Sequence, residues 1–346
     1  MKKNILALAI GAAMTAAYVP AMAEMKVSGR AHMSMDHMDN GAKSKMDLSS
    51  NSSRIRFAGK KDITEDLQGF VQLETTINLD RRAEDNSGTR GDTFMTRDSF
   101  LGFKGDFGTV RLGYFDTPTK KVRSFTDMFG DRVGDARNMT NGTFDQRFHN
   151  SVHYQTPSFS GLTLDIQYST DNRGKSGEQT STVNVRESHS TSLSYKAGDL
   201  TAVVAYESQG QNDGVDAKVG MRAGLTYNLT KGFRVAGFFE DADKNSGDNN
   251  VFGLGAYYDL TPEYRLRGQY YMATESSAKK DGANMLAMGI DRRFGRDLTL
   301  YAMYAATSND ANASFRVTGG GHGSQMSPSA AGKNVSAISL GAIYNF

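Results

Sequence analysis

The segment FGLGAYYDLTPEYRLRGQYYMAT, residues 252–274, decides the fold class of this chain. Apolar residues occupy every second position from Phe252 in its first half and again from Tyr264 in its second half. Side chains at every second position lie on one face of a β-strand. A Thr-Pro pair at 261–262, which suits a tight turn, separates the two halves. The segment therefore predicts two antiparallel strands joined by a short turn.

The same alternation recurs along the chain and predicts an all-β protein with sixteen strands. The connections alternate between short turns and long polar stretches. The expected strands lie near 24–36, 52–61, 67–79, 95–105, 108–115, 150–157, 162–171, 187–197, 199–208, 218–228, 232–241, 250–260, 263–274, 284–294, 297–307 and 334–346.

An even number of antiparallel strands, with short turns at one end and long loops at the other, is typical of an outer-membrane barrel. Lipid cannot satisfy backbone polar groups, so the last strand has to pair with the first. We therefore expect a 16-stranded antiparallel transmembrane β-barrel spanning residues 24–346.

A secreted β-sandwich or propeller is the alternative, since alternation alone does not separate it from a barrel. Three features favour the barrel. Tyr and Phe gather near strand ends, as an interfacial girdle requires. The difference between long and short connections persists throughout, and the sequence ends at an aromatic residue within an expected strand.

Composition excludes several classes of function. The chain has no cysteine, which rules out disulfides, thiolate metal sites and cysteine nucleophiles. Without Lys2 and Lys3 the 40 basic residues become 38, equal to the 38 acidic ones, so no basic field points to nucleic acid. No stretch after the first residues has eighteen consecutive apolar positions, as a transmembrane helix would need.

The first 23 residues are expected to be a signal peptide rather than part of the fold. Lys2 and Lys3 precede an apolar run at 5–17, and Ala21-Met22-Ala23 fits a cleavage site. Export to the cell outer membrane of a Gram-negative bacterium is the expected outcome.

One connection, residues 115–149, is far longer than the others that precede it. It contains 35 residues and carries acids at Asp127, Asp131 and Asp135. A loop of this length in a compact chain is usually functional. We expect it to fold into the barrel and narrow a water-filled pore.

The segment TRDSFLGFKGDFGTVRLGYFDTP, residues 96–118, resembles the hairpin that precedes the third loop in Gram-negative general diffusion porins. The ending Ile-Tyr-Asn-Phe at 343–346 is similar to the terminal signal read by the outer-membrane assembly machinery. The resemblance implies a homotrimer in outer-membrane lipid and lipopolysaccharide that passes small hydrophilic solutes and ions. It also implies an inward third loop whose acids face basic residues on the wall.

The resemblance places the constriction residue by residue. The segments Ser28–Arg30, Ser53–Gly59 and Thr96–Arg97 match wall positions, and Arg147 matches the base that enters the sixth strand. In the loop, Thr126–Met128 matches the segment of one family acid, at Asp127, and Asp131, four residues after Asp127, matches the second. With Asp135, a further acid of the loop, and Arg132 added from the sequence itself, the expected constriction set comprises Arg30, Arg54, Arg97 and Arg147 on the wall, Asp127, Asp131 and Asp135 on the loop, and Glu74 and Arg132 as further lumen residues.

The loop tip departs from the family. At 129–134 many relatives carry a Pro-Glu-Phe-Gly-Gly sequence, whereas this chain lacks the proline, has Asp131 for the glutamate and adds Arg132. Five acids and six bases from 115 to 149 predict a weak ionic preference that leans to anions.

Other functions have weaker support. A substrate-selective, anion-preferring porin would use extra lumen bases such as Arg265 and Arg267, which are otherwise ordinary wall charges. A receptor or adhesin barrel with a plugged lumen is suggested by the long loop 309–333, whose glycine run predicts flexibility.

His149 and His153 could share a face, but two histidines without a carboxylate make a poor metal site. We expect no enzyme activity, catalytic residue, metal or cofactor.

Overall fold

The computed structural model describes residues 24–80, 94–172, 186–211, 216–243, 249–276 and 279–346. The expected signal peptide, residues 1–23, lies outside them. The described strands are β1 (Glu24–Asp39), β2 (Ser44–Ser50), β3 (Arg54–Thr64), β4 (Leu67–Ile77), β5 (Phe94–Thr96), β6 (Ser99–Gly105), β7 (Gly108–Asp116), β8 (Arg147–Gln155), β9 (Leu162–Ser169), β10 (Ser188–Ala197), β11 (Leu200–Gln209), β12 (Lys218–Thr230), β13 (Phe233–Ala242), β14 (Val251–Asp259), β15 (Tyr264–Ala273), β16 (Ala283–Phe294), β17 (Leu298–Asn309) and β18 (Val335–Asn345).

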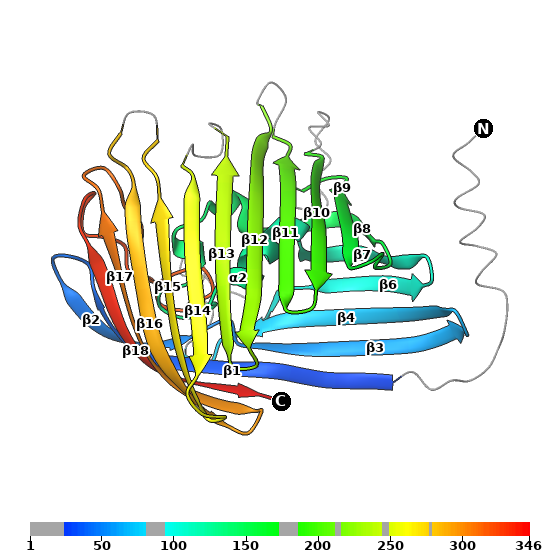
Figure 1. Ribbon diagram of the computed structural model, residues 1–346, viewed down its shortest axis with the longest axis horizontal. Coiled ribbons are helices and arrows are strands. Elements are labelled where there is room, and N and C mark those ends of the chain that lie inside the picture. Colours follow the sequence, from blue (N-terminus) through cyan, green and yellow to red (C-terminus); the bar gives the residue numbers. More distant parts are fainter. Residues whose placement is uncertain (1–23, 81–93, 173–185, 212–215, 244–248, 277–278) are drawn as a thin grey trace.

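These eighteen segments make sixteen barrel strands, because two pairs of segments are each one interrupted strand. β2 and β3 pair with successive parts of β1, and β5 and β6 pair with successive parts of β4. All pairings are antiparallel and follow the chain order. In Figure 1 the strands β10–β16 cross β1, β3 and β4 behind them, as tilted strands on opposite walls of a barrel do.

The barrel closes where β1 meets β18. Arg30 lies opposite Asn345, and the pairing continues to Asp39 opposite Ser336. Beyond β18, Gly29 donates to the Phe346 carbonyl at 2.8 Å and Phe346 donates to the Gly29 carbonyl at 3.1 Å. The sheet therefore has no free edge at this junction, and the predicted closure of a 16-stranded barrel is confirmed.

Side chains alternate between the lumen and the outside along each strand. On β16, Met285 and Ala287 are fully buried, whereas Leu286 and Met288 are 43% and 48% exposed. Large apolar side chains on most other strands are exposed in the same way. An apolar outer surface of this kind suits contact with lipid.

The sequence reading missed β2. It ended the first strand at residue 36 and began the second at 52, but β1 continues to Asp39 and pairs with β2. Met46 and Leu48 point outward on β2 and are exposed, and their neighbours are small or charged, so the apolar signal is weak. The strand that was expected to run unbroken from 95 to 105 is likewise interrupted, at 97–98.

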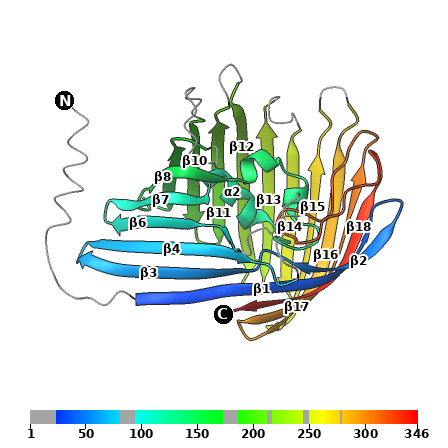
Figure 2. The same ribbon diagram turned by 180° about the vertical axis from the view of Figure 1, so that it is seen from behind.

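The loop 115–149 contains regular structure that alternation did not predict: α2 (Pro118–Thr126) and the short 3₁₀ helices η1 (Ala136–Asn138) and η2 (Gly142–Asp145). Figure 2 shows α2 on the inner side of the sheet, against β11–β13. No helix among the described residues has the length and apolarity to cross a membrane.

The last connection, 310–334, also folds inward. Its glycine-rich composition predicted a flexible loop, but the structure instead shows a packed one. Val317, Thr318 and His322 are almost fully buried. Val317 joins an apolar cluster with Val133 of the loop 115–149 and Val335 on the inner wall.

Candidate functional site

Local sequence explains how the loop 115–149 begins. The hydroxyl of Thr117 accepts a hydrogen bond from the Lys120 backbone at 3.1 Å and caps α2, and Pro118 occupies the first turn. One face of α2 packs on β12, where a side chain at Gly224 would collide with Val122 and Phe125. A glycine on the inner face thus makes room for the helix.

A buried ion network ties this loop to the barrel wall. Arg222 of β12, fully buried, binds Glu240 of β13 at 2.6 Å and Asp145 of the loop at 3.0 Å. Arg123 of α2 binds the same Asp145 at 2.8 Å. Burial opposes ionisation, but Arg123 and then Arg222 hold the pKa of Asp145 below its usual range.

The sequence analysis did not identify Arg222 or Glu240. One signal was available: the two residues lie opposite each other on neighbouring inward positions. Gly220 and Gly224 flank Arg222 on the same face, and side chains there would collide with the loop. Charged residues between inward glycines indicate a wall that another segment covers.

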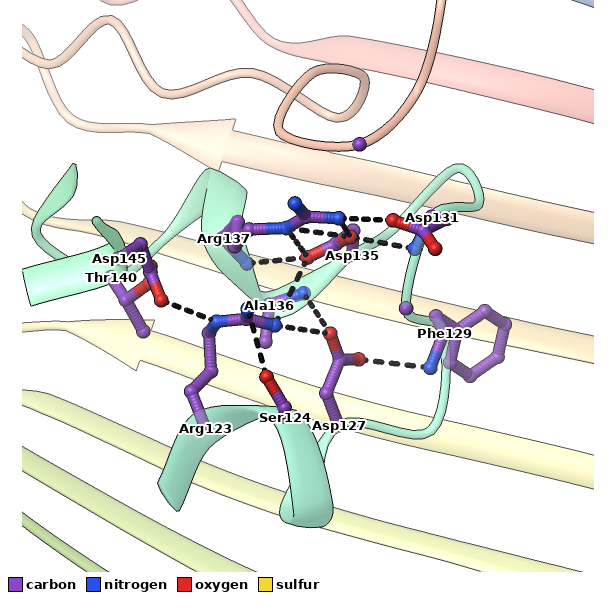
Figure 3. A network of polar contacts seen from close by, with 12 residues as sticks. Arg123, Ser124, Asp127, Phe129, Asp131, Asp135, Ala136, Arg137, Thr140 and Asp145 are labelled. Atoms are coloured by element: carbon purple, nitrogen blue, oxygen red, sulfur yellow. Dashed lines mark hydrogen bonds and ion pairs between the residues drawn. The ribbon is translucent and has the colours of Figure 1, made fainter. Parts of the chain in front are cut away.

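Among the described residues, two of the three loop acids form their ion pairs with arginines of the loop alone (Figure 3). Asp127 accepts hydrogen bonds from the Phe129 backbone at 2.8 Å and from Ala136 at 3.2 Å, and it pairs with Arg123. Asp135 is fully buried and pairs with Arg137 at 2.7 Å. Burial, with Asp135 nearby, raises the pKa of Asp127 to about 7.

Asp131 is the loop acid that meets the wall. One oxygen of its carboxylate binds Arg137 at 2.5 Å, and the other lies 3.7 Å from Arg30 of β1 and 3.8 Å from Arg54 of β3. Its backbone has a φ of 64°, which Asp tolerates better than most residues. Burial opposes ionisation, but Arg137 and Arg54 hold the pKa of Asp131 well below its usual range.

A second group of charges lies beside these wall arginines. Glu74 of β4 binds Arg97 at 2.7 Å and Arg56 at 2.6 Å, and it lies 3.9 Å from Arg54. The single buried carboxylate thus contacts three guanidinium groups that project from the same wall, and it fixes their positions.

Arg147 and Arg132 occupy other places. Arg147 binds Asp98 at 2.6 Å and Asp116 at 3.0 Å, where the loop 115–149 leaves and rejoins the sheet. Arg132 lies over the ring of Tyr301, 5.2 Å from its centroid. Among the described residues, neither arginine forms an ion pair with the carboxylate of Asp131.

Arg265 and Arg267, the expected wall charges, each bind a carboxylate on the barrel. Arg265 pairs with Asp259 at 2.7 Å and stacks on Tyr257, and Arg267 pairs with Asp291.

The two histidines of β8 do not share a face. Asn150 has a φ of 47°, and the register between β7 and β8 shifts beside it. His153 therefore points inward to Asp165 at 2.8 Å, whereas His149 stacks on Tyr114. The suggestion that they face the same way is wrong, because the bulge reverses the alternation. No cluster of three or more potential metal ligands occurs among the described residues.

The site places one buried carboxylate, that of Asp131, opposite several arginine side chains of the wall. Asp131 is held by an inward loop, and Arg30, Arg54, Arg56 and Arg97 project from β1, β3 and the β5–β6 interruption. Opposed charges of this kind produce a field across the lumen that acts on ions and dipolar solutes.

Comparison with known families gives one match that spans most of the chain. The family model described as Gram-negative porin matches residues 7–312. The major outer membrane protein P.IB of Neisseria gonorrhoeae is 30% identical over 187 residues, 51% of each chain. The chain thus spans about half the length of the first curated relatives it matches. The monosaccharide porin of a Halomonas species is 28% identical over 288 residues, 75% of this chain and 76% of that one.

Solved structures show the same fold. The anion-selective porin from Comamonas acidovorans superposes with a TM-score of 0.77 at 21% identity, covering 94% of this chain and all of that one. OmpF of Salmonella typhi, in complex with daunomycin, gives a TM-score of 0.67 at 19% identity, covering 93% and 97%. OmpT of Vibrio cholerae in its trimer form gives 0.67 at 15% identity, covering 94% and 99%.

Proposed function

Because this chain belongs to the Gram-negative porin family, we propose that it forms a water-filled channel for passive diffusion of small hydrophilic solutes and ions across the outer membrane. A sixteen-stranded barrel encloses a lumen wider than its own side chains can fill. The family's named members include outer-membrane proteins and porins, which are channels rather than enzymes.

One observation carries the proposal: Asp131, on a loop packed inside the barrel, faces Arg30 and Arg54 at 3.7 and 3.8 Å. These three residues and Arg97 line the proposed aperture, and Glu74 positions its arginines. In this proposal Asp127 and Asp135 shape the loop tip, and Arg147 closes the base of the loop by binding Asp98 and Asp116.

The proposed channel prefers anions weakly. Four arginines (Arg30, Arg54, Arg56 and Arg97) stand against two carboxylates (Asp131 and Glu74) in this group. The excess of positive charge on the wall attracts anions, and Asp131 limits the preference. A substrate-selective porin for anions is the second candidate, and the same arginine excess favours it.

We also propose that the protein assembles as a homotrimer in outer-membrane lipid and lipopolysaccharide. The trimer form of the OmpT structure supports this assembly for a protein with the same fold. The receptor or adhesin barrel with a plugged lumen stays the alternative from a different class: the segment 310–334 that suggested it packs inside the barrel, and conductance separates a narrowed pore from a plugged one.

Single-channel recording in a planar bilayer tests the function. Stepwise conductance that closes in thirds is the expected result for an open trimer, and a salt gradient gives the sign of selectivity. A conductance that saturates with one anion would favour the selective candidate. A folded barrel that gives no steps would overturn the channel proposal, and a reversal potential on the cation side would overturn the anion preference.

A further inference from the structure

The segment 310–334, here called the final loop, contacts the tip of the loop 115–149 inside the barrel. Gly134 donates its backbone N–H to the carbonyl of Val317 at 2.8 Å. Val317 and Met326 pack with Phe129 and Val133 of that tip, against the inner wall. The two long loops therefore share one apolar cluster.

The glycine run of the final loop lies directly on the charged pair of the aperture. A side chain at Gly321 would lie 1.9 Å from the Asp131 carboxylate and 2.2 Å from Arg137, and one at Gly320 would meet Arg137 at 2.8 Å. Only glycine lets the backbone approach this closely. The final loop thus covers one side of the carboxylate that faces the wall arginines.

The final loop is also bound to the wall at the interruption between β2 and β3, next to Arg54. The Ser52 hydroxyl donates to the Gly321 carbonyl at 2.9 Å, and Gly323 donates to the Asn51 side chain at 2.9 Å. These contacts satisfy backbone groups of the loop inside the barrel.

A buried histidine anchors the loop on its other side. His322 lies 3.2 Å from Asp36 of β1, and both side chains are fully buried. The other ring nitrogen of His322 binds the carbonyl of Ser324 at 2.8 Å. Ser324 itself donates to Asp47 of β2 at 2.5 Å. The anchor is thus built from side chains of the loop and of two neighbouring strands.

We propose that the final loop is a second constriction element, which narrows the channel together with the loop 115–149 and sets the exposure of Asp131. His322, Asp36 and Gly321 act as positioning residues in this arrangement. The inference rests on the proposed channel function, since a constriction matters only in a conducting pore.

The first test replaces residues 312–330 with a short Gly-Ser linker and compares single-channel conductance with that of the intact protein. Conductance is expected to rise roughly 1.5-fold or more, because the aperture widens on one side. Replacement of the exposed turn 260–263, between β14 and β15, with a Gly-Ser linker of equal length is the control and is expected to leave conductance unchanged. An intact protein that conducts and a loop variant with the same conductance would overturn the inference alone. An intact protein that does not conduct would overturn the channel function itself.

The second test uses His322→Ala, which keeps the loop but removes its anchor. The current is expected to fluctuate between the intact level and a larger one, as the loop leaves and returns. The matched control is His37→Ala, since His37 is exposed on the outer face of the same strand as Asp36. If His322 has only a structural role, His322→Ala should lower the thermal stability without producing the larger current level. That result would argue against the inference even if the variant that lacks residues 312–330 failed to fold.

Discussion

Arg222 of β12 and Asp145 of the loop 115–149 are bound at 3.0 Å, with the arginine fully buried. Glu240 on one side and Arg123 on the other complete the network. The loop is therefore held as part of the interior rather than laid over the pore. Removing one member of such a buried network is strongly destabilising, because it leaves the charge of its partner buried and uncompensated.

Arg222→Met is expected to lower the free energy of unfolding by about 3–5 kcal/mol, because it leaves the buried Glu240 without its cation and Asp145 with Arg123 alone. Thermal unfolding followed by circular dichroism measures the change. Arg292→Met is the control, since Arg292 is exposed on the outer face of β16. Neutralising the network with Asp145→Asn and Glu240→Gln in the Arg222→Met background should restore part of the loss. Equal stability of Arg222→Met and the intact protein would contradict this account of the network.

Asp131→Asn is expected to increase the preference for anions, because it removes the negative charge that faces Arg30 and Arg54. A roughly twofold rise in the anion-to-cation permeability ratio is expected from the loss of one charge at a narrow point. The reversal potential in a salt gradient measures it. Asp297→Asn, in an exposed turn, serves as the control. A shift toward cations would show that Asp131 does not act on permeating ions.

The barrel could be predicted from the sequence because its defining signal is local. Alternation such as that from Tyr264 to Met272 reports which side of one strand meets lipid, and it needs no knowledge of distant residues. Its failures are local too. At Asn150 one residue with positive φ reverses the alternation and separates His149 from His153.

The interior of the site could not be predicted in the same way. Asp127, Asp131 and Asp135 share one loop and a regular spacing, yet only Asp131 faces the wall arginines. The folding of the loop pairs Asp127 with Arg123 and Asp135 with Arg137, whereas Asp131 shares Arg137 and turns its other carboxylate oxygen to the wall. Contacts between distant segments, such as Gly134 with Val317, leave no periodic pattern in the sequence.

The buried carboxyl of Asp127 is expected to make the stability of the protein fall as the pH rises. Burial and Asp135 raise its pKa from 3.8 to about 7. A carboxyl with a raised pKa in the folded state binds its proton more tightly there. Its contribution to stability is complete below pH 3.8 and is lost as the pH rises to about 7.

Asp127→Asn should therefore flatten the decline in unfolding temperature between these pH values. The variant keeps an oxygen that can accept the hydrogen bond from Phe129. Asp131 and Asp145, with lowered pKa values, contribute in the opposite direction, so only the difference between variant and intact protein is informative. The control Asp297→Asn should show the same decline in unfolding temperature with pH as the intact protein. If the unfolding temperatures of Asp127→Asn and of the intact protein declined in parallel, the raised pKa of Asp127 would be ruled out as the cause.

Gly321→Ala tests how closely the final loop approaches the aperture. The added methyl group would lie 1.9 Å from the Asp131 carboxylate, so either the carboxylate or the loop has to move. Either movement changes the charge that faces Arg54, and the reversal potential should shift while the unfolding temperature changes little. Gly142→Ala is the matched control, since a methyl group there meets nothing within 4 Å. If Gly321→Ala and Gly142→Ala gave the same reversal potential, the glycine run would have no bearing on the charge at the aperture.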